Sequence, residues 1–232
     1  MKRLMLLLFS VSIFSIMYAQ VHWNVRGAVG AANLSGIDLD SHYTYQGGVG
    51  ILSYKVGVGA YISFSEKWAL QPVLNFASKG SKVSASYGNE QLFEGMLMYK
   101  LYYMELPIFV AYKLQMAQKV SLIFKAGPYI GYGLSGKASF SASDNISLKE
   151  TFKGNLFQDG CDYGGITYID DKNLKTTALN RFDAGVALGA EMNINHILFG
   201  VEGTFGLSPV SSNLLNSKPK NVALYLTLGY QF

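Results

Sequence analysis

Polar and apolar residues alternate along the last twelve positions of the chain. In residues 221–232 every second side chain is apolar, at Val222, Leu224, Leu226, Leu228, Tyr230 and Phe232. A period of two indicates a β-strand with one apolar face. About ten such residues, tilted across a bilayer, match the height of an outer-membrane barrel wall. The segment is therefore predicted to be the closing strand of a transmembrane β-barrel.

Seven earlier segments show the same alternation. They are residues 23–31, 54–64, 68–76, 102–112, 122–132, 182–192 and 197–207. With the terminal segment they make eight, and an even number of strands is typical of bacterial barrels. The sequence predicts an all-β fold, an eight-stranded antiparallel up-and-down transmembrane β-barrel.

The links between these segments alternate between long and short. In chain order they are residues 34–50, 65–67, 80–98, 115–119, 138–181, 193–196 and 208–220. Outer-membrane barrels join short periplasmic turns with long extracellular loops in this way. With both termini in the periplasm, the four long links are predicted to face outward, and 138–181 is the longest.

The amino-terminal residues have the anatomy of a secretory signal peptide. The basic residues Lys2 and Arg3 precede an apolar run of fourteen residues, 4–17. The small residue Ala19, which is suited to cleavage, follows. The run is shorter than the roughly 20 residues of a membrane-spanning helix. We predict a signal peptide over residues 1–19, cleaved near Ala19, and a barrel domain over 20–232. The expected location is the bacterial outer membrane.

Composition favours the membrane orientation over a soluble, lipocalin-like barrel. Only 15% of residues are charged, against about 25% in soluble domains. A soluble barrel would bury the apolar faces of the strands and expose the other faces to water. Those other faces are rich in Gly and Ala, which better suit a narrow interior filled by side chains. The formal charge of +4 is too small to indicate nucleic-acid binding.

Aromatic residues gather at the ends of the predicted strands. Rings at these levels would lie among lipid headgroups. The predicted girdle comprises Trp23, Phe64, Trp68, Tyr112 and Phe232 on the periplasmic side, and Tyr54, Phe76, Tyr102, Tyr132, Phe182 and Phe205 on the outer side.

Several stretches resemble the Bacteroidota outer-membrane barrels called PorT-like. They are RGAVGAANLSG (26–36), residues 62–82, YMELPIFVAYK (103–113), KAGPYIGY (125–132), FDAGVALGAE (182–191) and residues 221–232. They include Pro72, Pro107 and Pro128, which lie within strands and remove ladder donors, so we expect bulges or irregular pairing there. The resemblance implies a single outer-membrane barrel of a Gram-negative, Bacteroidetes-type bacterium. The family's named member serves the type IX secretion pathway, but no set of residues in this sequence matches one that would indicate the same role.

The inward faces of the predicted strands carry nine charged residues. They are Arg26, Lys55, Lys79, Glu105, Lys113, Lys125, Asp183, Glu191 and Glu202. Unpaired charges in one small interior would be costly, so we expect a paired network. It would form either a gated ion path or a plug that holds the cylinder together. The plug is favoured because eight-stranded barrels have bores that side chains fill.

No motif establishes an enzyme, and no cofactor or metal site is predicted. An outer-membrane acyl-transfer enzyme would need a nucleophile beside a base; His22 and His196 fall on the periplasmic side, and His42 with Ser81, Ser84 or Ser86 forms no recognised signature. Gly131, Gly133 and Gly136 satisfy GxGxxG but open no helix. Asp159, Asp162, Asp170 and Asp171 lack EF-hand spacing. Cys161 is either a free thiol or an intermolecular bridge.

The combined interpretation is a monomeric, non-enzymatic barrel with a filled lumen. Its extracellular loops would contact a protein or ligand, with Tyr87, Tyr99, Tyr163 and Tyr168 as candidate contacts. Its other partners would be outer-membrane lipid and the barrel-assembly machinery, through the strand ending at Phe232. The alternatives are a component of a secretion or envelope-assembly apparatus, a small-solute porin, or a lipid-modifying enzyme.

Overall fold

Ten strands form one antiparallel sheet in the computed structural model, which describes residues 20–36, 44–87, 93–143, 148–151, 155–158, 179–211 and 218–232. The strands are β1 (Gln20–Ser35), β2 (Thr44–Val49), β3 (Ile51–Ser63), β4 (Trp68–Tyr87), β5 (Phe93–Ala117), β6 (Val120–Ser143), β7 (Leu148–Thr151), β8 (Phe182–Ile194), β9 (Ile197–Gly206) and β10 (Lys220–Gln231). The predicted signal peptide, His42, Cys161, Tyr163, Tyr168 and the four loop aspartates lie outside the described residues, as do the side chains of Ser84, Ser86 and Tyr87.

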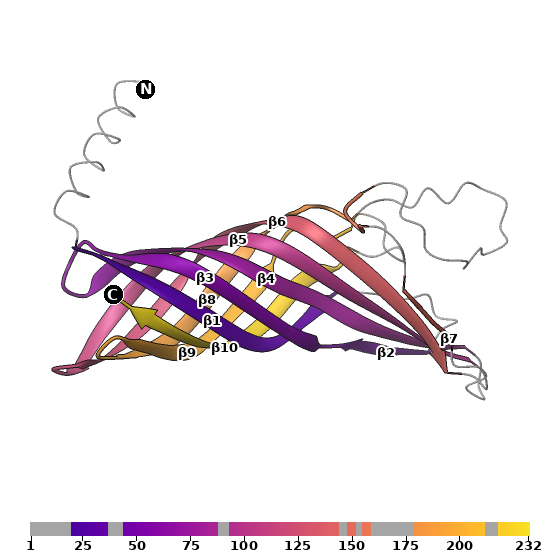
Figure 1. The fold of residues 1–232 in the computed structure, drawn as a ribbon, viewed down its shortest axis with the longest axis horizontal. Helices are drawn as coiled ribbons and strands as arrows, with labels where there is room; N and C mark the ends of the chain where they lie inside the picture. Colours follow the sequence, from indigo (N-terminus) through magenta and orange to yellow (C-terminus); the bar gives the residue numbers. More distant parts are fainter. Residues whose placement is uncertain are drawn as a thin grey trace, which may run out of the picture.

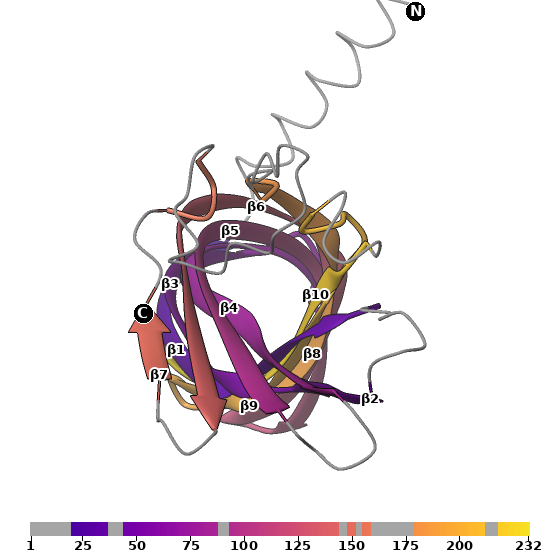
Figure 2. The ribbon, with the colours of Figure 1, turned by 90° about the vertical axis from the view of Figure 1, so that its right-hand side faces the viewer.

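Eight of these strands close into the predicted up-and-down barrel. Each pairs with its neighbours in the order β1-β3-β4-β5-β6-β8-β9-β10, and β10 pairs back with β1. Figure 2 shows the barrel viewed approximately along its axis. Since Asn24 pairs with Gln231, β1 begins where β10 ends, at the end that carries the short turns (Figure 1). The predicted fold class is confirmed.

Side chains alternate between the lipid face and the bore along every wall strand. In β10, Leu224, Leu226 and Leu228 are 64–65% exposed, whereas Ala223 and Tyr225 between them are buried. A continuous outer band of large apolar side chains would be unfavourable in water but suits contact with acyl chains. Among the described residues, no helix has the length and apolar character needed to span a membrane.

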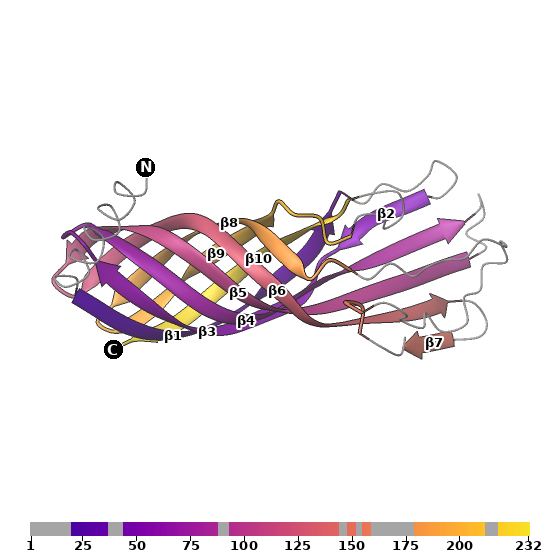
Figure 3. The ribbon, with the colours of Figure 1, turned by 90° about the horizontal axis from the view of Figure 1, so that it is seen from above.

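Three strands are much longer than the bilayer requires. β4 has 20 residues, β6 has 24 and β5 has 25, whereas about 9–11 residues cross a membrane. Their outer ends pair with one another, with β2 on one side and β7 on the other. This five-stranded sheet, which we call the extracellular platform, projects beyond the barrel wall (Figure 3).

The platform corrects the predicted boundaries of three long links. Residues 80–87 and 93–98 belong to β4 and β5, residues 138–143 to β6, and β2 lies within the expected loop 34–50. The alternation that marks a wall strand is imposed by lipid on one face. The alternation nevertheless continues through Val83, Ala85 and Tyr87 of β4 and through Ala138, Phe140 and Ala142 of β6, so a signal for these extensions was present in the sequence.

The three strand prolines lie in a row across β4, β5 and β6. Pro72 pairs with Ile108, the neighbour of Pro107, and Pro107 pairs with Tyr129, the neighbour of Pro128. Paired positions are missing beside them, but the register is the same on either side of each gap. The expected irregular pairing is therefore present, whereas none of the three prolines requires a bulge.

Candidate functional site

The bore holds eight of the nine charged residues predicted to face inward. Arg26, Lys55, Lys79, Glu105, Lys125, Asp183, Glu191 and Glu202 are all at most 9% exposed. They come from seven strands, and the alternation along each strand points their side chains toward the bore. We call this set the lumen network. Lys113 does not join it, because its place near the end of β5 puts it at the periplasmic mouth of the barrel.

The half of the network nearer the periplasm is a chain of five alternating charges. Arg26 Nη1 lies 3.2 Å from Glu191 Oε2, and Lys125 Nζ lies 2.8 Å from the same oxygen. Lys125 Nζ also lies 2.9 Å from Glu202 Oε2, whose other oxygen pairs with Lys55. The two carboxylates are thus each shared between two cations.

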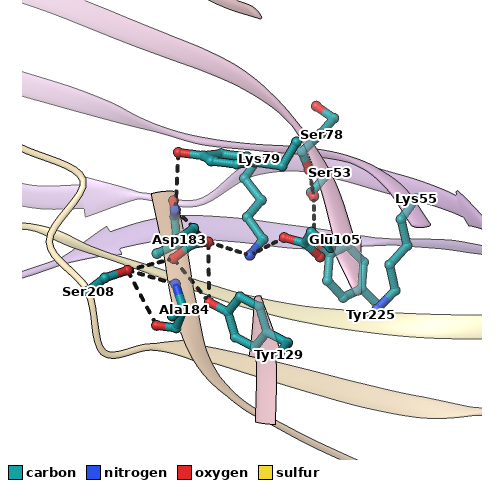
Figure 4. Close-up of polar contacts among 12 residues, drawn as sticks. Ser53, Lys55, Ser78, Lys79, Glu105, Tyr129, Asp183, Ala184, Ser208 and Tyr225 are labelled. Carbon is teal, nitrogen blue, oxygen red and sulfur yellow. Dashed lines mark hydrogen bonds and ion pairs between the residues drawn. The ribbon is translucent and has the colours of Figure 1, made fainter. Parts of the chain in front are cut away.

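The other half is centred on Lys79, whose side chain is completely enclosed. Its ammonium lies 2.5 Å from Glu105 Oε1 and 3.1 Å from Asp183 Oδ2 (Figure 4). Asp183 also accepts hydrogen bonds from the Tyr129 hydroxyl, at 3.3 Å, and from the Asn221 amide, at 3.1 Å. The ammonium lies 4.7 Å from the centre of the Tyr129 ring, within the range of a cation–π contact.

The network is electrically balanced, with four cations and four carboxylates among these eight residues. The chain around Lys125 has three cations and two carboxylates, and the group around Lys79 has one cation and two carboxylates. Their excess charges are opposite. Burying a charge is tolerated only when it is paired and hydrogen-bonded, so the balance makes a filled bore possible.

An apolar cap closes the bore on the extracellular side. It consists of Leu156, Phe157 and Leu179, which are 2–5% exposed and pack with Tyr99 and Tyr103 of β5. The Phe157 ring meets the Tyr103 ring edge-on, with centroids 5.6 Å apart. Tyr99, proposed above as a loop contact, therefore lies inside the barrel.

Backbone hydrogen bonds tie the cap to the wall. Leu156 N donates to Gly136 O at 3.0 Å, and Leu179 N donates to Leu156 O at 2.8 Å. Arg181 Nε donates to the carbonyl of Phe157 at 3.2 Å, while Gly133 N donates to Arg181 O at 2.6 Å. The cap was not predicted from the sequence. The adjacent Leu156 and Phe157 inside a polar link were the available signal.

A cavity of about 180 Å³ opens at the periplasmic mouth. Its lining includes His22, Tyr61, Glu66, Lys113, Asn193 and Gln231. Two of its lining residues, Tyr61 and Ile123, are buried in a small cluster with Ala69 and Ala111. This cluster, the lumen network and the cap are thus three groups of buried side chains inside the barrel.

The eleven girdle residues lie on the outer face of the barrel, and most are 41–65% exposed. On the periplasmic rim the Trp68 and Tyr112 rings are 4.8 Å apart. Toward the outer side Phe76 and Tyr102 stack at 5.9 Å. Their outward position is the geometry that headgroup contact requires.

The glycine motif and two of the histidines occupy positions within the barrel wall or at its periplasmic end. Gly131, Gly133 and Gly136 follow one another along β6. His22 Nδ1 lies 3.3 Å from the carbonyl oxygen of Phe232, and His196 Nδ1 lies 2.9 Å from that of Gln231, so both imidazoles contact the end of β10. In the part of the chain that the structure describes, no group of three or more His, Cys, Asp or Glu side chains is placed to hold a metal ion.

The chain is similar to a known protein family and to several solved structures. Among solved structures, the chain is similar to Ail of Yersinia pestis at 15% identity (TM-score 0.35; 92% of this chain, 99% of that one). It is also similar to the neisserial surface protein NspA (10%, 0.41; 92% and 99%) and to OprG from Pseudomonas aeruginosa (10%, 0.43; 92% and 97%). No curated protein matches the chain. The sequence profile of the outer membrane protein beta-barrel domain matches residues 17–212. The chain therefore belongs to the outer membrane protein beta-barrel domain family, and its location is the bacterial outer membrane.

Proposed function

We propose that this protein is a non-enzymatic, non-conducting outer-membrane anchor that presents an extracellular platform to a protein or ligand. The observation that carries the proposal is the contrast between the two parts of the molecule. The bore is filled by a balanced charge network and closed by an apolar cap. The three longest strands instead continue outside the wall, where a sheet has no role in spanning the membrane.

Conductance in planar lipid bilayers tests the closed bore. We expect the purified barrel to insert without steady channels, while a large porin in the same apparatus conducts. Phe157→Ala is expected to remain closed as well, because the lumen network lies below the cap. Steady channels from the unmodified barrel would contradict the proposal and favour the small-solute porin.

Crosslinking in cells tests the platform. In a Cys161→Ser background, a cysteine replacing Lys149 of β7 reports on the outer surface, and a cysteine replacing Gln118, between β5 and β6, reports on the periplasmic surface. We expect crosslinked species from the first position and none from the second. An edge strand such as β7 offers unpaired backbone groups that an extended partner segment can use.

A second candidate is a component of a secretion or envelope-assembly apparatus that works from the periplasm. The resemblance to PorT-like barrels and the polar cavity at the periplasmic mouth support it. It predicts the opposite crosslinking result, with partners captured at Gln118 and not at Lys149.

We further propose that the signal peptide, residues 1–19, is cleaved near Ala19, leaving a monomeric barrel of residues 20–232. The start of β1 at Gln20 supports this boundary. Mass spectrometry of the protein purified from outer membranes is expected to find Gln20 at the amino terminus. An intact Met1 would contradict the proposal.

A further inference from the structure

The periplasmic cavity is lined by two opposite charges that do not form an ion pair with each other. Lys113 and Glu66 both line it, and neither forms an ion pair with any described residue. This differs from the lumen network, in which every charge has an opposite partner. The mouth of the barrel thus offers one cation and one anion in a single recess.

The cavity also offers uncharged hydrogen-bonding groups. The Tyr61 hydroxyl has no hydrogen-bond partner among the described residues. Gln231 accepts a hydrogen bond from Asn193 through Oε1 at 2.9 Å, and its amide N–H groups make none within that part of the chain. A polar recess with unused donors can hold water or the polar groups of a ligand.

The size and position of the recess limit what it can hold. Its volume of about 180 Å³ is below the roughly 300–1,000 Å³ of sites for drug-sized ligands, so a single small group fits better than an extended molecule. Its lining residues Tyr61 and Ile123 are buried in the cluster with Ala69 and Ala111, and the cavity opens at the mouth of the barrel. A ligand would therefore enter and leave on the periplasmic side.

We propose that the periplasmic cavity binds a small zwitterionic, amino-acid-like group. The carboxylate of the ligand would contact Lys113 and the unused donors of Tyr61 and Gln231, and its ammonium would contact Glu66. A simple anion would leave Glu66 without a partner, and a simple cation would leave Lys113 without one. A zwitterion satisfies both charges. The site is separate from the extracellular platform, so either proposal can fail alone.

Nuclear magnetic resonance titration of the barrel in lipid nanodiscs tests this site. The probes are alanine, N-acetylalanine, which keeps only the negative charge, and alaninamide, which keeps only the positive charge. We expect alanine to shift signals of the lining residues and to bind about tenfold more tightly than either analogue, the effect of one charge-assisted hydrogen bond. Equal affinities for the three compounds, or no shifts with alanine, would overturn the proposal.

Charge-removing variants assign the two ends of the ligand. Lys113→Gln is expected to reduce alanine affinity to that for alaninamide, and Glu66→Gln to that for N-acetylalanine. Lys119→Gln is the matched control, because Lys119 lies in a periplasmic turn outside the cavity and its replacement changes the net charge equally. If Lys119→Gln weakens alanine binding as much as Lys113→Gln, general attraction explains the binding and the site is excluded.

A further probe distinguishes a free amino acid from an amino-acid residue attached to a larger molecule, since both carry the same zwitterionic group. In γ-glutamyl ethylamide the zwitterion is joined to a longer group through its side chain. Binding equal to that of alanine shows that the site accepts a residue attached to a larger periplasmic molecule, and binding of alanine alone restricts the site to a free amino acid. Either result supports the zwitterion site.

Discussion

The ring of Phe157 occupies the space that a side chain at Gly133 would need. A Cβ placed on Gly133 would lie 2.5 Å from the Phe157 ring, closer than any normal contact. The ring has little freedom to withdraw, since it is 3% exposed and packs against Tyr103. Gly133 therefore permits the apolar cap to enter the bore.

Gly133→Ala is expected to destabilise the barrel by about 1–3 kcal/mol, the usual cost of overpacking a filled interior. Thermal unfolding in detergent micelles, followed by circular dichroism, measures the effect. Gly27→Ala is the matched control, because a Cβ there meets no atom within 4 Å. Equal unfolding temperatures for the two variants would show that the cap yields without cost.

Lys79 and Lys55 are expected to differ in importance although both are buried lysines. Lys79→Met leaves Glu105 and Asp183 without their shared cation, whereas after Lys55→Met the carboxylate of Glu202 keeps Lys125. Removing one partner of a buried ion pair costs about 3–5 kcal/mol of stability. Lys79→Met should therefore lower the free energy of unfolding by at least that much, and Lys55→Met by less.

Urea unfolding of the barrel in lipid vesicles compares these two variants. The triple variant Lys79→Met, Glu105→Gln, Asp183→Asn is expected to regain part of the loss, because it no longer buries unpaired charge. If Lys55→Met is the more damaging substitution, the sharing of carboxylates is not what stabilises the network.

The two tryptophans are expected to report the aromatic girdle. Trp23 and Trp68 are 63% and 45% exposed on the outer face, where indole rings prefer the headgroup level. In the single-tryptophan variants Trp23→Phe and Trp68→Phe, brominated lipids labelled near the headgroups should quench fluorescence more strongly than lipids labelled at the bilayer centre. Strong quenching by aqueous iodide would place these rings in water and contradict the membrane orientation.

Phe232 is expected to matter for assembly in the cell more than for the folded barrel. Its backbone N donates to Trp23 O at 2.8 Å, a contact that does not depend on the side chain. Phe232→Ala should lower the amount of folded barrel in outer membranes while refolding into lipid vesicles is unchanged. Leu228→Ala is the control, because Leu228 has almost the same exposure, 64% against 65%. Equal losses from both variants in cells would argue against recognition of the Phe232 side chain.

The sequence alone determined the class of fold and the face that each wall side chain occupies. A period of two is a local property, and an apolar stripe such as Val222 to Phe232 can satisfy lipid only if its partners, Ala223 to Gln231, face inward. The same rule placed Arg26, Lys79 and Glu191 in the bore without any knowledge of their partners.

Only the tertiary structure decided which charges meet. Lys79 lies 104 positions from Asp183, and their contact depends on the strand order and register around the whole ring, which no local pattern encodes. Lys113 shares the inward alternation but lies too close to the end of β5 to reach the network. The cap was also beyond the sequence, because Leu156 and Phe157 lie outside any strand and their place in the bore depends on packing with Tyr99 and Tyr103.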